Sequence, residues 1–460
     1  MNKRENRKWG ICLGKYFGTD GFRGEAGEVL TARHAFKIGK FLAWYYGQGG
    51  HRVRGVIGKD TRRSSYMLEY AIASGLASAG ADVYMLHVTT TPSVSFVAKS
   101  EDFDFGIMIS ASHNPYYDNG IKIVNSKGEK TDEAVTDKIE EYLDGTTEEI
   151  PYAKGAEIGE IVDHFAGRNR YIGYLISVSR SSFKGLKIGL DCANGGAWML
   201  AKSVFDALGA KTYTINNAPN GMNINKGAGS THIEALCRHV KENNLDMGFA
   251  FDGDADRCIA VDEQGREVNG DSILYILATA MKGAGELKSN TVVTTVMSNL
   301  GLYRALEDSG IEYVKTAVGD RFVYEEMVKM GYELGGEQSG HIIMSKYATT
   351  GDGILTAIKV TEAVIEAKAT LSELSAPVVM LPQITRNVPV LSKDAVMENK
   401  EVKACVEAIE RELGRGGRIL LRKSGTEPVI RIMVEAQSEK ECCDYIERVL
   451  SVIAKEGLNL

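Results

Sequence analysis

Three aspartates, Asp252, Asp254 and Asp256, alternate with small residues in the stretch DGDADR. An extended backbone turns alternate side chains to one side, so this spacing predicts that the three carboxylates converge. Like charges held so close repel each other unless a cation neutralises them, and oxygen ligands in that number suit Mg²⁺ or Ca²⁺. Apolar stretches on both sides, GFAFD and CIAV, favour a loop between two buried strands over an exposed acidic turn.

A calcium-binding loop of the EF-hand type is an alternative for the same aspartates, because Glu263 falls at its twelfth position. That loop requires glycine at its sixth position, where this chain has Arg257, and a helix on each side. Here a strand precedes the aspartates, and a predicted hairpin with Gly265 near its turn follows them. The sequence therefore favours a cation site of another kind.

A second polar stretch, SASHNP, contains Ser112 and His113 and is followed by YYDNGIK, which ends at Lys122. The apolar run FDFGIMI before it predicts a buried strand, which Pro115 prevents from continuing. We therefore expect a hydroxyl, an imidazole and a lysine just past the carboxyl end of a strand, where open α/β sheets bind ligands. The same residue types also form ordinary turns, and the stretch alone leaves that alternative open.

The stretch RKSGTEP at 422–428 is a third candidate and combines two cations, two hydroxyls and a glycine. A glycine lets backbone N–H groups converge, and an arginine fork matches a phosphate, so the turn could bind one. An exposed cationic hairpin turn is an equally good interpretation of this segment taken alone.

The elements around these stretches repeat. Strand, helix, glycine and strand follow one another in residues 53–86, 186–215 and 291–316. Such βαβ units predict three similar α/β domains with parallel or mixed sheets. Each unit precedes a strand that leads into one polar turn: SASHNP, DGDADR or GEQSGH.

The end of the chain has a different pattern. It predicts a helix over 393–413, two strands joined by a turn over 418–436, and a last helix over 438–454. This order indicates a small α+β domain built on an antiparallel hairpin.

Length, composition and charge exclude several classes of protein. The 460 residues exceed what one core usually serves, so several domains are expected. A net charge of −7 argues against a general nucleic-acid binder. The seven cysteines show no zinc spacing and suit a reducing cytoplasm, and the longest apolar run, Ile273–Met281, is too short to span a membrane.

The chain resembles the α-D-phosphohexomutase superfamily from Lys15 to its C-terminus. The resemblance is carried by an ordered set of motifs: KYFGTDGFRG (15–24), GKDTR (58–62), TPSVSF (91–96), SASHNPYYDNGIK (110–122), DGDADR (252–257), GEQSGH (336–341), TTGDG (349–353) and RKSGTEPVIR (422–431). It implies four domains around a central cleft, the first three α/β with mixed sheets and the fourth α+β. The expected boundaries are 1–13 for a poorly ordered extension, then 14–155, 156–257, 258–370 and 371–460.

The resemblance also implies a role for each matching residue. Ser112 would carry a phosphoryl group and, with Asp252, Asp254 and Asp256, would hold Mg²⁺, while Arg257 would steady the metal loop. Lys122 and His341 would transfer protons, and Arg23 would support the phosphate. The substrate would contact two loops, through Glu337, Ser339, Arg422, Ser424, Gly425, Thr426 and Arg431.

Within the superfamily, Gln338 and the stretch VGDR at 318–321 resemble the glucosamine branch, whereas mannose and glucose enzymes usually carry GEMSGH and a histidine after VG. The implied activity is interconversion of glucosamine 6-phosphate and glucosamine 1-phosphate through a 1,6-bisphosphate, supplying UDP-N-acetylglucosamine and cell-wall precursors. Glucosamine or glucose 1,6-bisphosphate would serve as activator. A phosphomannomutase, a phosphoglucomutase or a non-enzymatic sugar-phosphate sensor are the alternatives, although a sensor would be expected to have lost Ser112, an aspartate or Lys122.

The implied partners are sugar phosphates and a second copy of the chain in a homodimer, with no nucleic acid and no membrane. The implied location is cytoplasmic.

Overall fold

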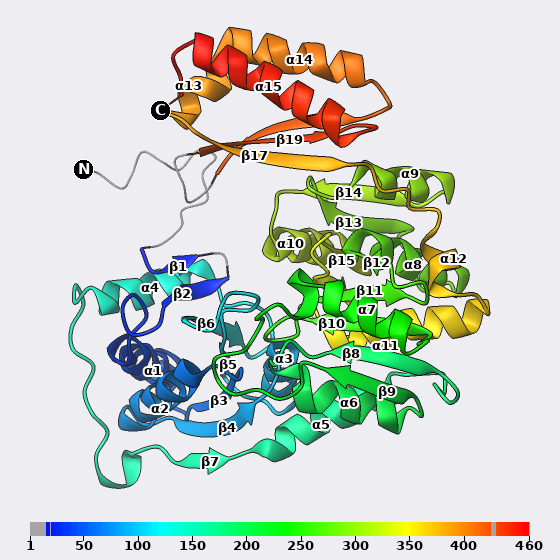
Figure 1. Cartoon of the computed structure of the whole chain (residues 1–460). Coiled ribbons are helices and arrows are strands. Elements are labelled where there is room, and N and C mark those ends of the chain that lie inside the picture. Colours follow the sequence, from blue (N-terminus) through cyan, green and yellow to red (C-terminus); the bar gives the residue numbers. More distant parts are fainter. Residues whose placement is uncertain (1–14, 19, 425–428, 460) are drawn as a thin grey trace. The chain divides into compact units, whose positions relative to one another are not determined.

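The computed structural model describes residues 15–18, 20–424 and 429–459 (Figure 1). These residues form two compact units, a larger one of residues 15–297 and 311–376 and a smaller one of residues 298–310 and 377–459. The larger unit contains three mixed sheets, and the smaller unit contains a fourth, antiparallel sheet. Three α/β sheets and a smaller α+β part confirm the fold class predicted from the sequence. The extension at 1–13 lies outside the described residues.

The first sheet is mixed. Its seven strands lie in the order β1 (Phe17–Gly18), β2 (Gly21–Glu25), β6 (Asp118–Asn125), β5 (Phe105–Ile109), β3 (Arg54–Lys59), β4 (Asp82–Val88) and β7 (Ile161–Asp163). Helices α1 (Ala32–Tyr46), α2 (Arg63–Ser78) and α4 (Glu133–Leu143) cover one face, and α3 (Thr91–Ser100) covers the other (Figure 1). Because adjacent strand residues point to opposite faces, Ile57 packs in the first of these cores and Val56 in the second.

The second sheet has five strands, in the order β12 (Glu267–Val268), β11 (Cys258–Asp262), β10 (Met247–Phe251), β8 (Lys187–Asp191) and β9 (Lys211–Ile215). Strands β9, β8 and β10 are parallel, and β11 is antiparallel to β10. The helical segments of this region are α5 (Phe165–Ser177), α6 (Ala197–Ala207), α7 (Glu234–Glu242) and the short η3 (Gly229–Thr231).

The third sheet has four strands, in the order β14 (Glu312–Thr316), β13 (Thr291–Thr295), β15 (Leu334–Gly336) and β16 (Ile342–Met344). Its part of the chain also forms α8 (Gly270–Gly283), α10 (Asp320–Met330), α11 (Gly353–Ala367) and α12 (Leu371–Ser375). Two further short helical turns of the larger unit are η1 (Gly47–Gly49) and η2 (Gly155–Glu157).

One antiparallel hairpin recurs in all three sheets and positions the candidate site. Its strands are β5 and β6 in the first sheet, β10 and β11 in the second, and β15 and β16 in the third. The turns of these hairpins are SASHNP with the residues after it, DGDADR, and the loop EQSGH. The repeat predicted from the sequence therefore presents three polar turns in the same way.

The smaller unit has the antiparallel order β17 (Gln383–Pro389), β19 (Val429–Glu435) and β18 (Arg418–Lys423), with helices α9 (Leu300–Asp308), α13 (Lys393–Glu398), α14 (Lys400–Leu413) and α15 (Glu439–Lys455). The single helix predicted over 393–413 is wrong, because Asn399 divides it. Its backbone is extended, and its side chain caps α14 by accepting the N–H groups of Glu401 and Val402.

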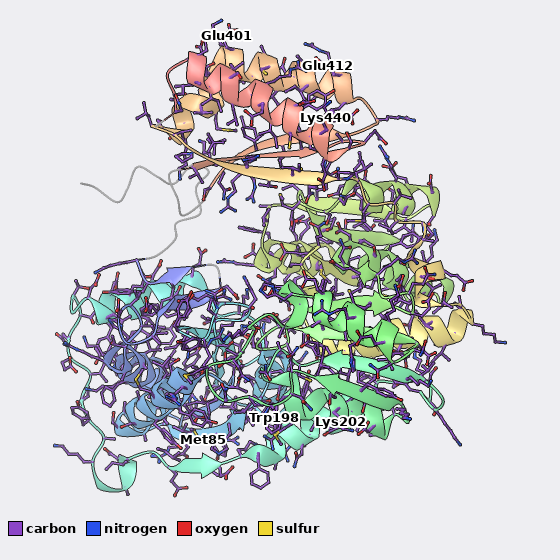
Figure 2. The ribbon with its side chains drawn as sticks, in the orientation of Figure 1. Met85, Trp198, Lys202, Glu401, Glu412 and Lys440 are labelled. Atoms are coloured by element: carbon purple, nitrogen blue, oxygen red, sulfur yellow. The ribbon has the colours of Figure 1, made fainter. Side chains whose placement is uncertain are left out.

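The helices of the smaller unit have one buried and one exposed face. Val402 and Ile409 of α14 and Ile446 and Val449 of α15 belong to its core. Charged side chains occupy the exposed faces, among them Glu401, Glu412 and Lys440 (Figure 2). Among the described residues, no helix is both long and apolar enough to cross a membrane.

Candidate active site

Ser112 lies in the turn after β5 and is 1% exposed. Its backbone is left-handed, with φ of 52°, and its N–H donates to Ser110 Oγ at 2.9 Å. Its hydroxyl donates to Asp252 Oδ2, so the turn of the first sheet meets the aspartate loop of the second. The pKa of the neighbouring His113 falls to about 4, because burial and the charges of Arg257 and Arg23 disfavour the imidazolium.

Arg62 is a buried residue that holds the Ser112 turn, and no role was predicted for it from the sequence. Its Nη2 donates to Ser112 O at 3.1 Å and to Asn114 O at 2.6 Å, and its Nη1 donates to Asp60. The rigid guanidinium fork allows all these bonds at once. The motif GKDTR, which ends at Arg62, could have indicated from the sequence that this residue belongs to the site.

The aspartate loop joins β10 to β11 and contains the predicted cation ligands. Oxygen atoms of Asp252, Asp254 and Asp256 lie within 4.8 Å of one another, and all three side chains are buried. The extended backbone predicted for this stretch is wrong. Strand pairing ends at Phe251 and Cys258, and the residues between them form a turn with Ala255 at φ of 54°. The carboxylates therefore converge through chain reversal and not through strand alternation.

The free oxygens of this cluster fit a cation. Asp254 Oδ1 and Asp256 Oδ1 are buried and accept no hydrogen bond. Burial, together with the charges of Asp256 and Asp254, raises the pKa of Asp252 well above its usual value. Buried anionic oxygens without partners are costly, and a hard divalent cation with oxygen ligands, such as Mg²⁺, would satisfy them.

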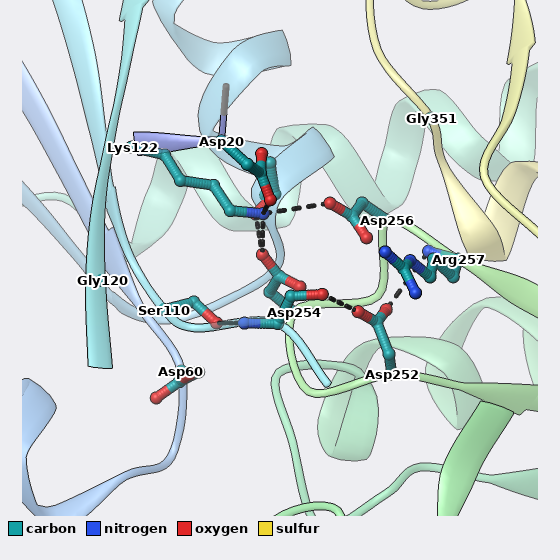
Figure 3. Close-up of polar contacts among 12 residues, drawn as sticks. Asp20, Asp60, Ser110, Gly120, Lys122, Asp252, Asp254, Asp256, Arg257 and Gly351 are labelled. Carbon is teal, nitrogen blue, oxygen red and sulfur yellow. Dashed lines mark hydrogen bonds and ion pairs between the residues drawn. The ribbon is translucent and has the colours of Figure 1, made fainter. Parts of the chain in front are cut away.

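Lys122 approaches the same cluster from the first domain (Figure 3). Its Nζ lies 2.7 Å from Asp254 Oδ2 and 3.0 Å from Asp256 Oδ2. Burial lowers the pKa of Lys122, but the charges of Asp20, Asp254 and Asp256 together hold it well above its usual value. The sequence placed Lys122 past the end of a strand, whereas it lies within β6, opposite Met108 of β5. A strand position fixes the ammonium more firmly than a loop would.

His341 reaches the cluster from the third sheet, where it is 4% exposed. Its Nδ1 lies 3.9 Å from Asp256 Oδ1, and its Nε2 lies 3.3 Å from Asp320 Oδ2. Burial lowers the pKa of His341, but Asp320 and Asp256 raise it by more. Ser112 and Lys122 from the first hairpin and His341 from the third therefore all contact the aspartate loop of the second.

Sequence reasoning assigned no role to Asp20, Lys130 and Asp320, which extend this charged group. Lys130 Nζ lies 3.0 Å from Asp20 Oδ1 and 2.7 Å from Asp320 Oδ2. Asp20 Oδ2 in turn lies 3.7 Å from Lys122 Nζ. The motifs KYFGTDGFRG and VGDR contain the two aspartates and were an available signal, whereas Lys130 follows an ordinary turn.

The remaining predicted residues of the larger unit lie in or near the same group. Arg23, on β2, contacts Asp20, and the backbone N–H of Arg257 donates to Asp252 Oδ1 at 3.2 Å. The Nε atoms of both arginines are buried and donate no hydrogen bond. Glu337 Oε1 accepts the N–H of Gly319 at 3.0 Å, and burial raises the pKa of Glu337. Ser339, in the same loop, is exposed.

The smaller unit carries the other predicted phosphate ligands. Arg422 on β18 lies directly opposite Arg431 on β19. Burial and the charge of Arg431 both lower the pKa of Arg422, whose Nε is buried and donates no hydrogen bond. Ser424 is buried, and its carbonyl accepts a bond from Lys393 Nζ at 2.8 Å. Gly425 and Thr426 lie outside the described residues. Two facing guanidinium groups favour an anion between them.

Comparison with known proteins matches nearly the whole chain to one family. The phosphoglucomutase/phosphomannomutase alpha/beta/alpha domains I, II and III match residues 14–149, 169–265 and 269–379, and the C-terminal domain of that family matches 386–452. Phosphoglucosamine mutase of Lachnospira eligens is 61% identical over 447 residues, which cover 97% of this chain and 99% of that protein. Phosphoglucosamine mutase of Bacillus pumilus is 48% identical over 444 residues, covering 96% and 99%.

Solved structures agree. A phosphoglucomutase/phosphomannomutase family protein from Burkholderia thailandensis superposes with a TM-score of 0.79 at 25% identity, covering 97% of this chain and 98% of that one. N-acetylphosphoglucosamine mutase of Aspergillus fumigatus, solved with GlcNAc-6P and magnesium, has a TM-score of 0.67 at 20% identity, covering 95% of both chains.

Proposed function

The chain belongs to the phosphoglucomutase/phosphomannomutase family, and from this premise we propose that it interconverts glucosamine 6-phosphate and glucosamine 1-phosphate. The observation that carries the proposal is the hydrogen bond from Ser112 Oγ to Asp252, within a buried group of three aspartates. A nucleophile beside a cation site is what phosphoryl transfer needs, since its catalysis consists mostly of positioning and charge stabilisation. The relatives named above support glucosamine phosphates as substrates.

We propose that Ser112 carries the phosphoryl group and that Asp252, Asp254 and Asp256 hold Mg²⁺ together with the group on Ser112. A phosphoserine adds about −1.5 to −2 charge beside three carboxylates, which disfavours it without a cation. Bound there, Mg²⁺ would neutralise charge on the transferring phosphoryl group. The two unpaired aspartate oxygens support this assignment.

In the first half of the proposed cycle, phospho-Ser112 donates to the free hydroxyl of glucosamine 6-phosphate. The bond between phosphorus and Ser112 Oγ breaks, a bond between phosphorus and the sugar oxygen forms, and the hydroxyl proton ends on Ser112 Oγ. Lys122 and His341 are the proposed carriers of that proton, because both are buried and both contact Asp256. The raised pKa of Lys122 favours its protonated form, so it can act as a donor. The pKa of His341 is also raised, but its Nε2 accepts the N–H of Gly351 at 3.0 Å, so its proton would be carried on Nδ1.

In the second half, glucosamine 1,6-bisphosphate reorients and returns its other phosphate to Ser112. Arg23 is the proposed phosphate ligand at the reacting end, because its Nε is buried and donates no hydrogen bond. Arg257 is proposed to steady the metal loop, since its backbone N–H donates to Asp252 Oδ1. Glu337 and Ser339 are proposed to bind the sugar. Arg422, Ser424, Gly425, Thr426 and Arg431 are proposed to hold the phosphate that is not reacting.

The proposal also includes priming of Ser112 by glucosamine or glucose 1,6-bisphosphate, a homodimer, and a cytoplasmic location in amino-sugar and cell-wall precursor synthesis. Six cysteines of the described residues are free thiols, which suits a reducing compartment.

The decisive experiment assays glucosamine, glucose and mannose 6-phosphates side by side with the wild type and with Ser112→Ala. We expect the highest kcat/KM for glucosamine 6-phosphate and no mutase activity in the variant. Intact-mass measurement should find a phosphate adduct on the wild type only. A wild type that prefers mannose 6-phosphate would contradict the proposed substrate, and an active alanine variant would contradict the proposed carrier.

A further inference from the structure

A loop of the second α/β domain, between β9 and η3, contacts the Ser112 turn of the first. Asn225 of this loop is 7% exposed, and its Nδ2 donates to Ser112 O at 2.8 Å and to Asn114 O at 2.9 Å. Arg62 donates to the same two carbonyl oxygens from the first domain. Each oxygen therefore accepts two hydrogen bonds, one from each domain, which uses both of its lone pairs.

The Ser112 turn needs such support because its backbone is strained. A left-handed φ of 52° is unfavourable for serine, whose Cβ crowds its own carbonyl oxygen there. The aspartate loop also encloses Ser112 O: a Cβ added at Gly253 would lie 2.5 Å from this oxygen and 3.0 Å from Asn225 Nδ2. The carbonyl is thus held by hydrogen bonds and surrounded closely by backbone of the domain that carries the aspartates.

Asn225 is itself fixed. Its N–H donates to Ala193 O at 2.9 Å, and its own φ is 57°, a conformation that asparagine adopts more readily than most residues. The hydrogen bonds of Arg62 connect the Ser112 turn to the first domain, whereas those of Asn225 connect it to the domain that supplies Asp252. Of these two side chains, only Asn225 connects the Ser112 backbone to the domain that carries the aspartate loop.

We propose that Asn225 is a positioning residue that holds Ser112 Oγ at the aspartate loop for phosphoryl transfer, and this inference rests on the proposed function. It acts through the backbone carbonyls of Ser112 and Asn114, to which its side chain donates. A reacting atom displaced by about 1 Å can lower a rate about a hundredfold. Losing Asn225 should therefore lower kcat more than it changes KM.

The test compares two substitutions with a matched control. Asn225→Gly keeps the left-handed backbone and removes the donor, and Asn225→Asp keeps the shape but points an acceptor at both carbonyls. The control is Asn223→Asp in the same loop, because within the described part of the chain the Asn223 side chain bonds only to Asn220 N–H and Ala218 O.

With glucosamine 6-phosphate, we expect kcat to fall between about tenfold and about a hundredfold in both Asn225 variants, with KM within about twofold of wild type. The control should stay within about twofold of wild type in both constants. Hydrogen exchange of a peptide spanning 110–118 should be faster in the Asn225 variants only, at an unchanged melting temperature.

Unchanged exchange in that peptide, or an equal loss of kcat in the control, would overturn the inference. The exchange measurement needs no substrate. An inactive wild type with normal protection of the peptide would therefore count against the proposed function and not against the contact of Asn225 with the Ser112 turn.

Discussion

Lys130 and Asp320 form an ion pair that joins the turn after β6 to the first residue of α10. This pair closes a ring in which basic and acidic residues alternate and each member contacts the next: Lys122, Asp20, Lys130, Asp320, His341 and Asp256. The two proposed proton carriers, Lys122 and His341, are members of the ring. Their positions and charges therefore depend on residues that do not contact the Ser112 turn.

Lys130→Met should lower both stability and activity. The substitution removes the cation that Asp20 and Asp320 share. Because Asp20 keeps Arg23 and Lys122 and Asp320 keeps His341, the expected cost is that of losing a bond to a charged group, about 1.5–3 kcal/mol. We expect that loss in the free energy of unfolding, together with a lower kcat. Lys127→Met, at an exposed position of the same turn, is the matched control and should change neither.

Removing Asp320 as well should restore part of the lost stability. The double variant Lys130→Met/Asp320→Asn lacks one of the two carboxylates that repel each other, so the two effects should not be additive. Strict additivity in urea unfolding would show that the ion pair contributes nothing.

Removing the divalent cation should abolish mutase activity reversibly. EDTA-treated protein is expected to regain activity with Mg²⁺, and Mg²⁺ should raise its melting temperature, since a ligand bound to the native state stabilises it. In Asp254→Asn one oxygen ligand is replaced by a neutral amide, so the rise should shrink at equal Mg²⁺ concentration. If Mg²⁺ left the melting temperature of the wild type unchanged, the proposed cation site at the three aspartates would be contradicted.

Asp352 should make stability depend on pH. Burial raises its pKa from 3.8 to about 6, although the N–H of Leu355 and the hydroxyl of Tyr171 oppose this. Because the native state keeps the proton that the unfolded chain releases, the contribution of Asp352 to the free energy of unfolding falls by about 3 kcal/mol as pH rises from 3.8 to about 6, and this contribution is constant above that range.

Asp352→Asn should lose this dependence, because asparagine still caps α11 but carries no charge. The melting temperature of the variant, relative to that of the wild type, should therefore be higher at about pH 7.5 than at about pH 4.5. An equal difference at both values would show that Asp352 does not titrate in this range.

Glu337→Gln should lower kcat/KM for glucosamine 6-phosphate more than for glucose 6-phosphate. The sugar amine is cationic at neutral pH, and a charge-assisted bond contributes about 1.5–3 kcal/mol against about 0.5–1.5 for a neutral one. The expected loss of preference is about tenfold, since about 1.4 kcal/mol corresponds to that factor. Equal losses on both sugars would mean that the amine is bound by another group.

Sequence patterns predicted the strands and turns that carry the site more reliably than they predicted how its side chains are arranged. Apolar runs ending in polar turns located the first strand and the turn of each of the three hairpins, because a buried strand has a continuous hydrophobic signal. The convergence of the aspartates was predicted for the wrong reason, since alternation says nothing about where a strand ends. Lys130 and Asn225 could not have been found, because their partners are distant in sequence and neither stands in a local pattern. The predicted domain boundaries stay a prediction.

At Ser112 the left-handed backbone lowers the stability of the fold, whereas the proposed activity requires the serine hydroxyl. For an L-residue with a Cβ, this conformation costs about 1–2 kcal/mol relative to the right-handed one, and glycine avoids the cost. Ser112→Gly should therefore unfold at a higher temperature than Ser112→Ala, although both lack the hydroxyl. The chain keeps at its proposed phosphoryl carrier a residue that its own backbone disfavours, and neighbouring contacts offset that local instability.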